Sequence, residues 1–323
     1  MDSFMCCMKK SNPNTSTSKR PSVSSKARLI EFAYRRARLL VAAFDRARMY
    51  YAVEGIHQFR TETKQRRALI GVLKFADIAP AAVEGLTVPR QLYKSAGTLR
   101  DIDICQEIAL AHLSEFDTSG FLNCLKHTEL KHRVFFEAAT KEHSVLSANK
   151  VRQSVDKSLD GLSDTQFRAL VVHRVLNLAN KLARPGDQDA WNASRLHEYR
   201  KSAKTLKYTL EIWQVCFGER VQITNFACSL QRVTALLGKW RDLTLTEEKL
   251  SAFAVSAKLP SRIDLKQAGG FGEELKIRRK RLKSQFLVGL PTIQNELSMV
   301  VNGFLAGVRE SGNVEKNKHL SLQ

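Results

Sequence analysis

An internal duplication of basic motifs is the feature that most constrains how this chain can fold. Two stretches, "IHQFRTETKQRR" (56–67) and "LHEYRKSAKTLK" (196–207), share the pattern H-x-x-R-x-x-x-K-x-x-[RK]. The pattern is filled by His57, Arg60, Lys64 and Arg67 and, 140 residues later, by His197, Arg200, Lys204 and Lys207. We call each set of four a ladder. A second motif follows each ladder: "GTLRDIDI" begins at Gly97 and "GKWRDLTL" at Gly238, 141 residues further on.

A third, looser match lies between "FLNCLKHTELKHRVFF" (121–136) and "FGEELKIRRKRLKSQF" (271–286). The cations of these two stretches are Lys126, Lys131 and Arg133 in the first and Lys276, Arg278, Arg281 and Lys283 in the second. Because the three matches occur in the same order with similar gaps, they predict that two halves of the chain share one architecture.

Helical periodicity runs through most of the sequence, and no segment alternates as a strand would. Only seven prolines and sixteen glycines occur in 323 residues, which favours long helices. We therefore expect an all-α protein of two facing four-helix units, because short connections favour antiparallel neighbours. The expected helices are about 27–54, 56–75, 90–115, 121–146, 164–182, 193–216, 224–253, 273–288 and 292–308, with a break at Gly55 and a polar stretch at 147–163.

Domain boundaries follow from composition. Residues 1–26 are rich in Ser, Thr and basic residues with little to bury, so we expect a disordered basic tail. The helical region is 27–310, with halves at about 27–150 and 164–310, and 311–323 are expected to form a flexible C-terminal tail.

Each ladder places its cations on one face of a helix. At 100° per residue the four positions span a sector of about 80° and a length of roughly 15 Å. Cations packed in this way repel one another unless acidic partners or a bound polyanion offset the repulsion. Glu62 lies about 160° around the helix from Arg60 and cannot neutralise the ladder from within. The ladders therefore predict a phosphate-binding surface, since Arg binds phosphate through a planar fork and Lys acts as a mobile point charge.

The two ladders, each followed by G-x-x-R-D, resemble the conserved histidine α-helical domain, CHAD, over roughly residues 27–310. The resemblance implies two pseudo-twofold-related four-helix bundles whose basic helices line a central groove that binds inorganic polyphosphate. It also implies that the protein associates with polyphosphate granules. The E-x-E-x-K mark of a fused triphosphate hydrolase is absent, so the chain resembles the stand-alone form of the family.

Two questions about the motifs stay open at the level of sequence. His57 and His197 either donate to phosphate or remain neutral and bond a neighbouring helix. Arg100 and Arg241 either face the groove or form structural ion pairs between helices with Asp101 and Asp242. The cations of 121–136 and 271–286 would form the opposite wall of the groove, unless they are simply a solvated face.

Net charge limits the choice of partner. Lys and Arg total 52 against 32 for Asp and Glu, a formal charge of +20, which favours polyanions. A nucleic-acid-binding protein is the main alternative, but no helix-turn-helix or zinc-finger pattern is evident. The sequence has no signal peptide, no apolar run of membrane-spanning length and no C-x-x-C pair among its six cysteines. We therefore expect a cytoplasmic protein.

Catalysis finds little support in the motifs. A P-loop is absent, and Gly269, Gly270 and Gly272 are not accompanied by its lysine. Cys124, His127 and His132 offer only three metal ligands, without the second pair that structural zinc sites use. We expect a non-enzymatic polyphosphate-binding protein with no cofactor. An accessory role in polyphosphate turnover, with His57 or His197 as acid or base, is a further alternative.

Overall fold

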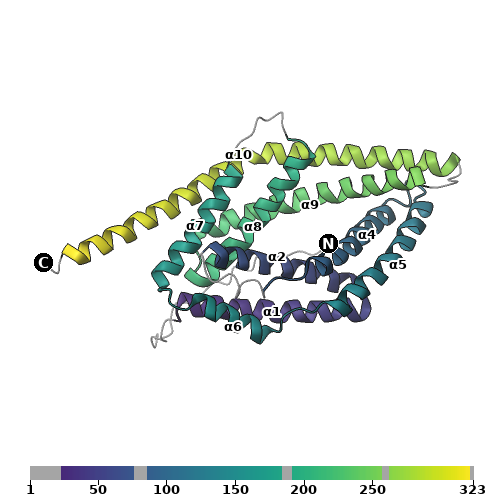
Figure 1. The fold of residues 1–323 in the computed structure, drawn as a ribbon. Helices are drawn as coiled ribbons and strands as arrows, with labels where there is room; N and C mark the ends of the chain where they lie inside the picture. The colour runs from purple at the N-terminus through teal and green to yellow at the C-terminus, as the bar shows by residue number, and fades with distance from the viewer. Residues whose placement is uncertain (1–22, 76–85, 184–190, 257–261, 321–323) are drawn as a thin grey trace, which may run out of the picture.

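The computed structural model describes residues 23–75, 86–183, 191–256 and 262–320, which are helical apart from short connections (Figure 1). In chain order the described helices are α1 (Ser25–Tyr50), α2 (Val53–Phe75), α4 (Arg90–Ala111), α5 (Ser119–Glu142), α6 (Ala148–Leu159), α7 (Asp164–Ala183), α8 (Ala193–Phe217), α9 (Val221–Ser256) and α10 (Arg262–Leu320). These ranges contain no strand, so the predicted all-α class is confirmed.

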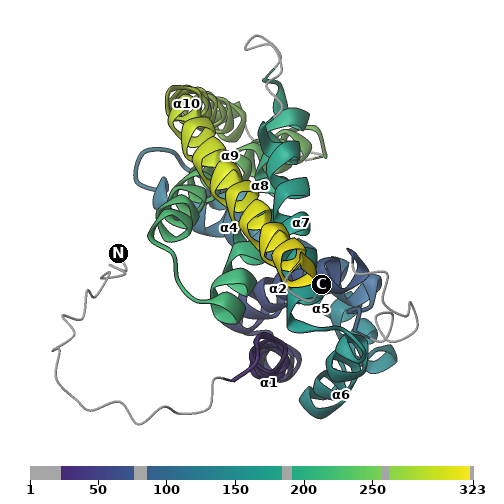
Figure 2. The ribbon, with the colours of Figure 1, turned by 90° about the vertical axis from the view of Figure 1, so that its left-hand side faces the viewer.

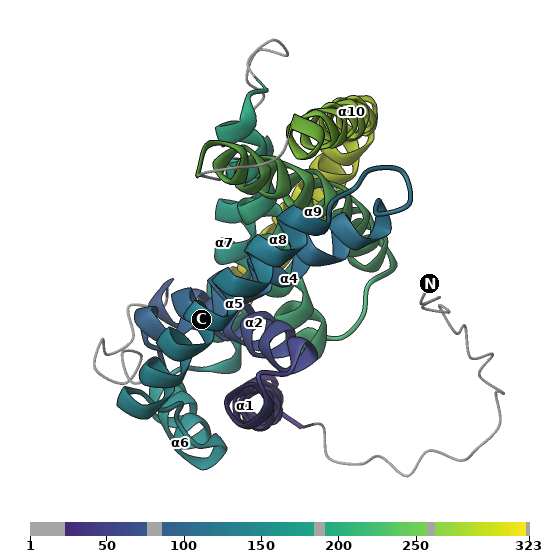
Figure 3. The ribbon, with the colours of Figure 1, turned by 90° about the vertical axis from the view of Figure 1, so that its right-hand side faces the viewer.

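The helices that carry the duplicated motifs occupy the middle of the molecule. Helices α1 and α6 lie on one side and α10 lies on the other, with α2, α4, α8 and α9 between them (Figures 2 and 3). Within this middle layer α2 packs against α4 and α8, and α4 packs against α9. Both ladders and both G-x-x-R-D motifs are thus on helices that contact one another.

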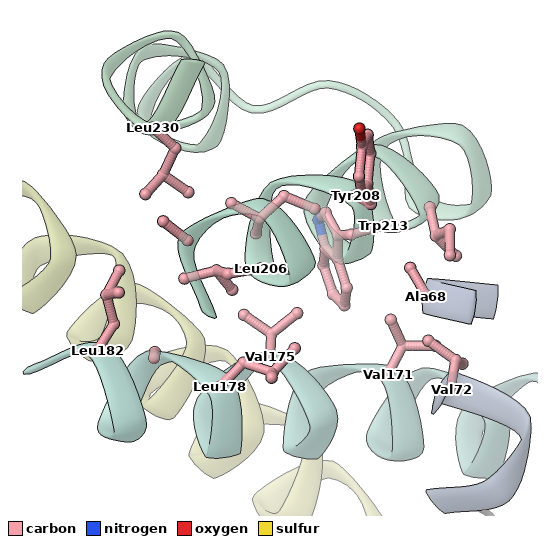
Figure 4. Close-up of a cluster of buried hydrophobic side chains, with 14 of the residues drawn as sticks. Ala68, Val72, Val171, Val175, Leu178, Leu182, Leu206, Tyr208, Trp213 and Leu230 are labelled. Carbon is pink, nitrogen blue, oxygen red and sulfur yellow. The ribbon is translucent and has the colours of Figure 1, made fainter. Parts of the chain in front are cut away.

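The largest hydrophobic cluster combines helices from both halves of the chain. Ala68 and Val72 of α2 lie among apolar side chains of α7 and α8, with Trp213 at the centre of the group (Figure 4). Trp213 is 1% exposed and its ring is 4.8 Å from that of Phe304 on α10. The core therefore does not divide at the boundary between the halves, and the predicted separation into two bundles stays a prediction.

Two smaller clusters complete the core, one among α1, α2, α4 and α5 and one among α4, α5, α9 and α10. Between α4 and α9 the Thr246 hydroxyl lies 3.5 Å from Cys105 Sγ, and both residues are fully buried. These two residues are separated by the same 141 positions as the G-x-x-R-D motifs. Corresponding positions of the two halves therefore contact each other.

The break between the first two helices is not where the sequence predicted it. Helix α1 ends at Tyr50 and is capped by Tyr51, which adopts a left-handed conformation (φ 49°) and whose N–H donates to the Ala47 carbonyl. Gly55, the predicted break, lies inside α2. A Cβ on Gly55 would be 2.9 Å from the Ala47 nitrogen, so this glycine allows α2 to approach α1 closely.

Helix α6 lies within 147–163, where the sequence predicted only a polar stretch. Ser147 caps it by accepting a hydrogen bond from the Lys150 N–H, and Val151, Val155 and Leu159 are buried at four-residue intervals. This single narrow apolar stripe is enough to hold the otherwise polar helix in place, because α6 packs mainly on one neighbour, α1.

Helix α10 is longer than predicted. It continues through Pro291, where the sequence predicted separate helices at 273–288 and 292–308, and it reaches Leu320, beyond the predicted start of the tail at 311. Proline removes one helical hydrogen bond without ending a helix that packing supports, and buried Leu290 and Ile293 on either side provide that packing. Helix α1 begins at Ser25, inside the predicted 1–26 tail, while residues 1–22 lie outside the described ranges.

One buried ion pair joins α1 to α2. Arg36 Nε lies 3.0 Å from Glu62 Oε2, although the two groups are not aligned as a hydrogen bond, and the Glu62 side chain is only 5% exposed. Burial raises the pKa of Glu62 to about 6, even though the Arg36 charge opposes this shift. The pair lies on the side of α2 away from the ladder and fixes the rotation of that helix.

We predict that Arg36→Met lowers the free energy of unfolding by about 3 kcal/mol at pH 7, because it leaves a buried carboxylate without its partner. The neighbouring variant Arg35→Met is the control: Arg35 pairs with Glu31 3.6 Å away, but both side chains are more than half exposed. That pair should contribute about 0–1 kcal/mol. Urea denaturation measures both variants, and equal losses would contradict the prediction.

Candidate functional site

The first ladder lies along α2 on the face opposite Glu62. Arg60 and Lys64 are half-buried, while His57 and Arg67 at the two ends are exposed. Phe59, Leu69 and Val72 of the same helix are buried, so the core faces of α2 hold the ladder in place. The positions of these four side chains thus follow from the apolar pattern of the helix itself.

The second ladder has the same arrangement on α8. Asn192 caps this helix by accepting a hydrogen bond from the Arg195 N–H at 3.0 Å. All four members, His197, Arg200, Lys204 and Lys207, are half-buried. The fold therefore withdraws this ladder further from water than the first.

The two ladders act on each other electrostatically where α2 packs against α8. The pKa of Lys64 is lowered to about 7, first by burial and then by the positive charges of Lys204 and Arg60. The pKa of Lys204 is lowered to about 8, first by burial and then by Arg200 and Lys207. The predicted meeting of the two ladders is thus present in the structure, and near neutral pH Lys64 is only partly charged.

Asp101 and Asp242 of the two motifs lie among these cations. Each interacts with a ladder arginine of its own half, Asp101 with Arg60 and Asp242 with Arg200. Each also interacts with the motif arginine of the other half, Arg241 for Asp101 and Arg100 for Asp242. Burial nevertheless raises the pKa of both carboxyls, and neither forms an ion pair within 4 Å in the described residues. The two aspartates thus reduce the repulsion among the cations without forming a close ion pair with any one of them.

The glycine that opens each motif leaves room for a ladder arginine. A Cβ added to Gly97 of α4 would lie 2.2 Å from Arg60 Nη1. The corresponding Cβ on Gly238 of α9 would lie 3.8 Å from Arg200 Nη2, an ordinary contact. The glycine and the arginine are therefore two parts of one arrangement, which is tighter in the first half.

Tyr93 of α4 is a part of the site that the sequence did not indicate. The Arg67 guanidinium lies 3.9 Å from the centre of its ring, and that of Arg60 lies 5.1 Å away. Such cation–π contacts are worth about 0.5–2 kcal/mol and hold a guanidinium in a fixed position. In the second half Lys207 instead donates to Gln231 and lies 5.2 Å from the Tyr208 ring.

The two motif arginines have different surroundings. Arg241 pairs with Glu248, seven residues later on α9, at 3.3 Å. Arg100 forms no ion pair within the described part of the chain, and it lines a cavity of about 600 Å³ between α4, α9 and α10. Lys239, which stands inside the quoted "GKWRD" but was not predicted as a site residue, lines the same cavity.

Three of the seven cations of the predicted opposite wall on α5 and α10 pair with carboxylates of their own helices, whereas no ladder cation forms an ion pair among the described residues. Arg133 pairs with Glu129, Lys276 with Glu273 at 2.7 Å, and Arg278 with Glu274. The remaining predicted cations of this wall are half-buried Lys283 and exposed Lys126, Lys131 and Arg281. The structure thus places the least compensated charge on the ladders.

Both ladder histidines have lowered pKa values. Partial desolvation by the surrounding helices is the largest cause for each, even though the His57 side chain is exposed, and Arg100 adds to it for His57, as Arg241 does for His197. No described residue hydrogen-bonds to either ring, so the structure shows no bond from either histidine to a neighbouring helix. A phosphate placed beside them would oppose the shift and favour the protonated, donating form.

Neither a metal-binding cluster nor a membrane-spanning helix is found among the described residues. They contain no group of three or more His, Cys, Asp and Glu side chains able to hold a metal ion, so Cys124, His127 and His132 do not form one. Nor does any of the described helices combine the length and apolar character needed to cross a bilayer.

We predict that Lys64→Met raises the free energy of unfolding by roughly 1–3 kcal/mol at pH 7. The pKa of Lys64 is about 7 in the folded protein against 10.5 in the unfolded chain. Between pH 7 and pH 10.5 the unfolded chain binds more protons than the folded protein does. The loss of stability caused by burying the charged Lys64 side chain is therefore complete below pH 7 and becomes smaller as the pH rises. Urea denaturation at pH 7 and pH 9 should show that the variant gains less stability with pH than the wild type. Lys131→Met, at an exposed position, is the control, and an unchanged pH slope in Lys64→Met would contradict the prediction.

Comparisons with known proteins agree with this arrangement. The family model of the CHAD domain matches residues 33–251. The crystal structure of the CHAD domain from the plant Ricinus communis superposes with a TM-score of 0.56 at 17% identity, over 85% of this chain and 92% of that one. PptA from Streptomyces chartreusis superposes with a TM-score of 0.53 at 11% identity, over 82% of this chain and 98% of that one.

None of the curated proteins compared with this chain matches it significantly. At these identities the two solved structures establish the fold alone. The match of the family model, which covers more than half of the sequence, shows that the chain belongs to the CHAD family.

Proposed function

We propose that this protein binds inorganic polyphosphate along the two facing ladders and does so without catalysing a reaction on it. The CHAD family is associated with polyphosphate binding, and the cations of this chain stand where such a ligand would need them. The residues proposed to contact the ligand are Arg60, Lys64, Arg67, Arg200, Lys204 and Lys207, with His57, His197, Arg100 and Arg241 at the margins.

The observation that carries the proposal is the meeting of the two ladders where α2 packs against α8. The pKa values of about 7 for Lys64 and about 8 for Lys204 reflect burial first and the neighbouring positive charges second. An anion placed between the ladders would oppose the repulsion and raise the pKa of both lysines. Binding would then be coupled to proton uptake near neutral pH.

The distribution of the positive charge over two helices favours a flexible linear polyanion as the ligand over a nucleic-acid duplex. The cations are distributed over two helices from opposite halves, whereas duplex readers usually present one recognition element to a groove. A phosphate chain has no bases to read and gains from many equivalent contacts. Attachment to polyphosphate granules in the cytoplasm would follow from binding the polymer, and we include it in the proposal.

The proposal is tested by titrating the protein with long-chain polyphosphate and with DNA of comparable charge at several salt concentrations. We expect polyphosphate to bind more tightly at every salt concentration, and its affinity to fall steeply with salt because bound cations are released. Phosphate release is followed in parallel and should be undetectable. Preference for DNA, or metal-dependent release of phosphate, would overturn the proposal.

We predict that combining Arg60→Glu with Arg200→Glu weakens polyphosphate binding roughly 100-fold or more, because each reversal removes a charge-assisted contact of about 1.5–3 kcal/mol. The matched control combines Lys150→Glu with Lys157→Glu, which makes the same change of charge at exposed positions of α6. Equal losses in the two double variants would show that diffuse charge alone attracts the ligand.

We also predict that Gly97→Ala weakens polyphosphate binding about 3- to 10-fold, because the new Cβ would displace the Arg60 guanidinium. The fold itself should not suffer, since alanine favours a helix over glycine by about 1 kcal/mol. Gly238→Ala is the control, because its Cβ would make only ordinary contact with Arg200. Calorimetric titration and thermal unfolding separate the two effects, and identical affinities for the two variants would contradict the role given to Gly97.

A further inference from the structure

The cavity between α4, α9 and α10 is not explained by polyphosphate binding. Its volume of about 600 Å³ falls within the range of roughly 300–1,000 Å³ that is typical of sites for small organic molecules. It is lined by Arg100 and Asp242 of the two duplicated motifs, so it adjoins the ladders. Its composition nevertheless differs from theirs in three respects.

The first respect is that its cations come from three helices and line one open cavity, in which Arg100 is half-buried and Lys239 and Arg281 are exposed. Arg100 from α4, Lys239 from α9 and Arg281 from α10 all line it, and none of the three has an ion-pair partner among the described residues. Arg278 lines it as well but is already paired with Glu274. The cavity therefore suits a group with several negative charges.

The second respect is an apolar wall, which the ladders lack. Ile108, Leu243 and Leu282 line the cavity, and all three are half-buried side chains that pack against the hydrophobic clusters behind them. An inorganic phosphate chain would leave this wall in contact with water. A ligand with an apolar body would cover it and gain about 25 cal/mol for each Å² of apolar surface removed from water.

The third respect is a set of hydrogen-bond acceptors that an anion cannot use. His112 is only 5% exposed, and its Nδ1 lies 2.8 Å from the Ile108 carbonyl, which can only accept, so Nδ1 carries the proton. When Nδ1 alone carries a proton, Nε2 is an acceptor; it is buried and has no hydrogen-bond partner among the described residues. Glu107 and Asp242 also line the cavity and add carboxylate acceptors.

We propose that this cavity binds a nucleoside polyphosphate. Its phosphates would meet Arg100, Lys239 and Arg281, its base would cover the apolar wall, and its hydroxyl or amino groups would donate to His112 Nε2 and the carboxylates. Inorganic polyphosphate has neither an apolar body nor such donors, and a fatty acid has a single charge and no donors. The site goes beyond polyphosphate binding, although Arg100 lies at the margin of both.

The test is a calorimetric titration of the full chain with ATP, inorganic tripolyphosphate and adenosine in metal-free buffer of low ionic strength. We expect ATP to bind at least tenfold more tightly than tripolyphosphate, which carries similar charge, and adenosine to bind weakly. Ala111 is an exposed residue at the edge of the cavity, and Ala111→Trp fills part of the space without removing a charge. It should weaken ATP binding at least tenfold and leave polyphosphate binding unchanged.

Ala169→Trp is the matched control, because Ala169 is an equally exposed alanine on α7. It should leave the affinity for ATP unchanged. If Ala111→Trp fails to fold, Lys239→Ala decides the question and should weaken ATP binding about fivefold or more. Equal affinities for ATP and tripolyphosphate, or unchanged ATP binding in a folded Ala111→Trp or Lys239→Ala variant, would overturn the proposal.

Discussion

The repulsion between the two ladders is the interaction on which the rest of the site depends. Bringing Lys64 towards Lys204 is unfavourable, and the fold tolerates it because the apolar faces of α2 and α8 are buried in the cores on either side. Asp101 and Asp242 reduce the repulsion from across the halves, and Tyr93 holds two of the guanidinium groups. The packing of the helices therefore gathers the cations of the two ladders, at some expense to the stability of the protein.

Compensation within a helix distinguishes the ladders from the other basic stretches. On α10, Glu273 and Glu274 stand three and four residues before the cations that they neutralise. On α2, the acidic residue within the ladder points away from it and pairs with Arg36 of α1 instead. Two segments with similar numbers of Lys and Arg thus differ in the charge that they offer to a ligand, and the spacing of their carboxylates explains why.

Much of this arrangement could be predicted from the sequence, because helical periodicity and the duplication fix which residues share a face. The all-α class follows from those regularities, and the meeting of the two ladders is what the resemblance to the CHAD domain implied. Tyr93 could not be found in this way, since its contact with Arg67 depends on how α4 is rotated against α2. Helix α6 was missed because its apolar stripe is one residue wide, and the continuity of α10 through Pro291 depends on tertiary packing.

The contact between Cys105 and Thr246 has a consequence for how the duplicated halves can change. Both side chains are fully buried and occupy corresponding positions, so each helix forms the wall against which its own counterpart packs. A larger side chain at either position fits only if the other becomes smaller, and the energies of such paired substitutions are not additive. The two halves are thus sterically coupled at this contact. The size of the side chain that one half can accept here is limited by the side chain at the corresponding position of the other half.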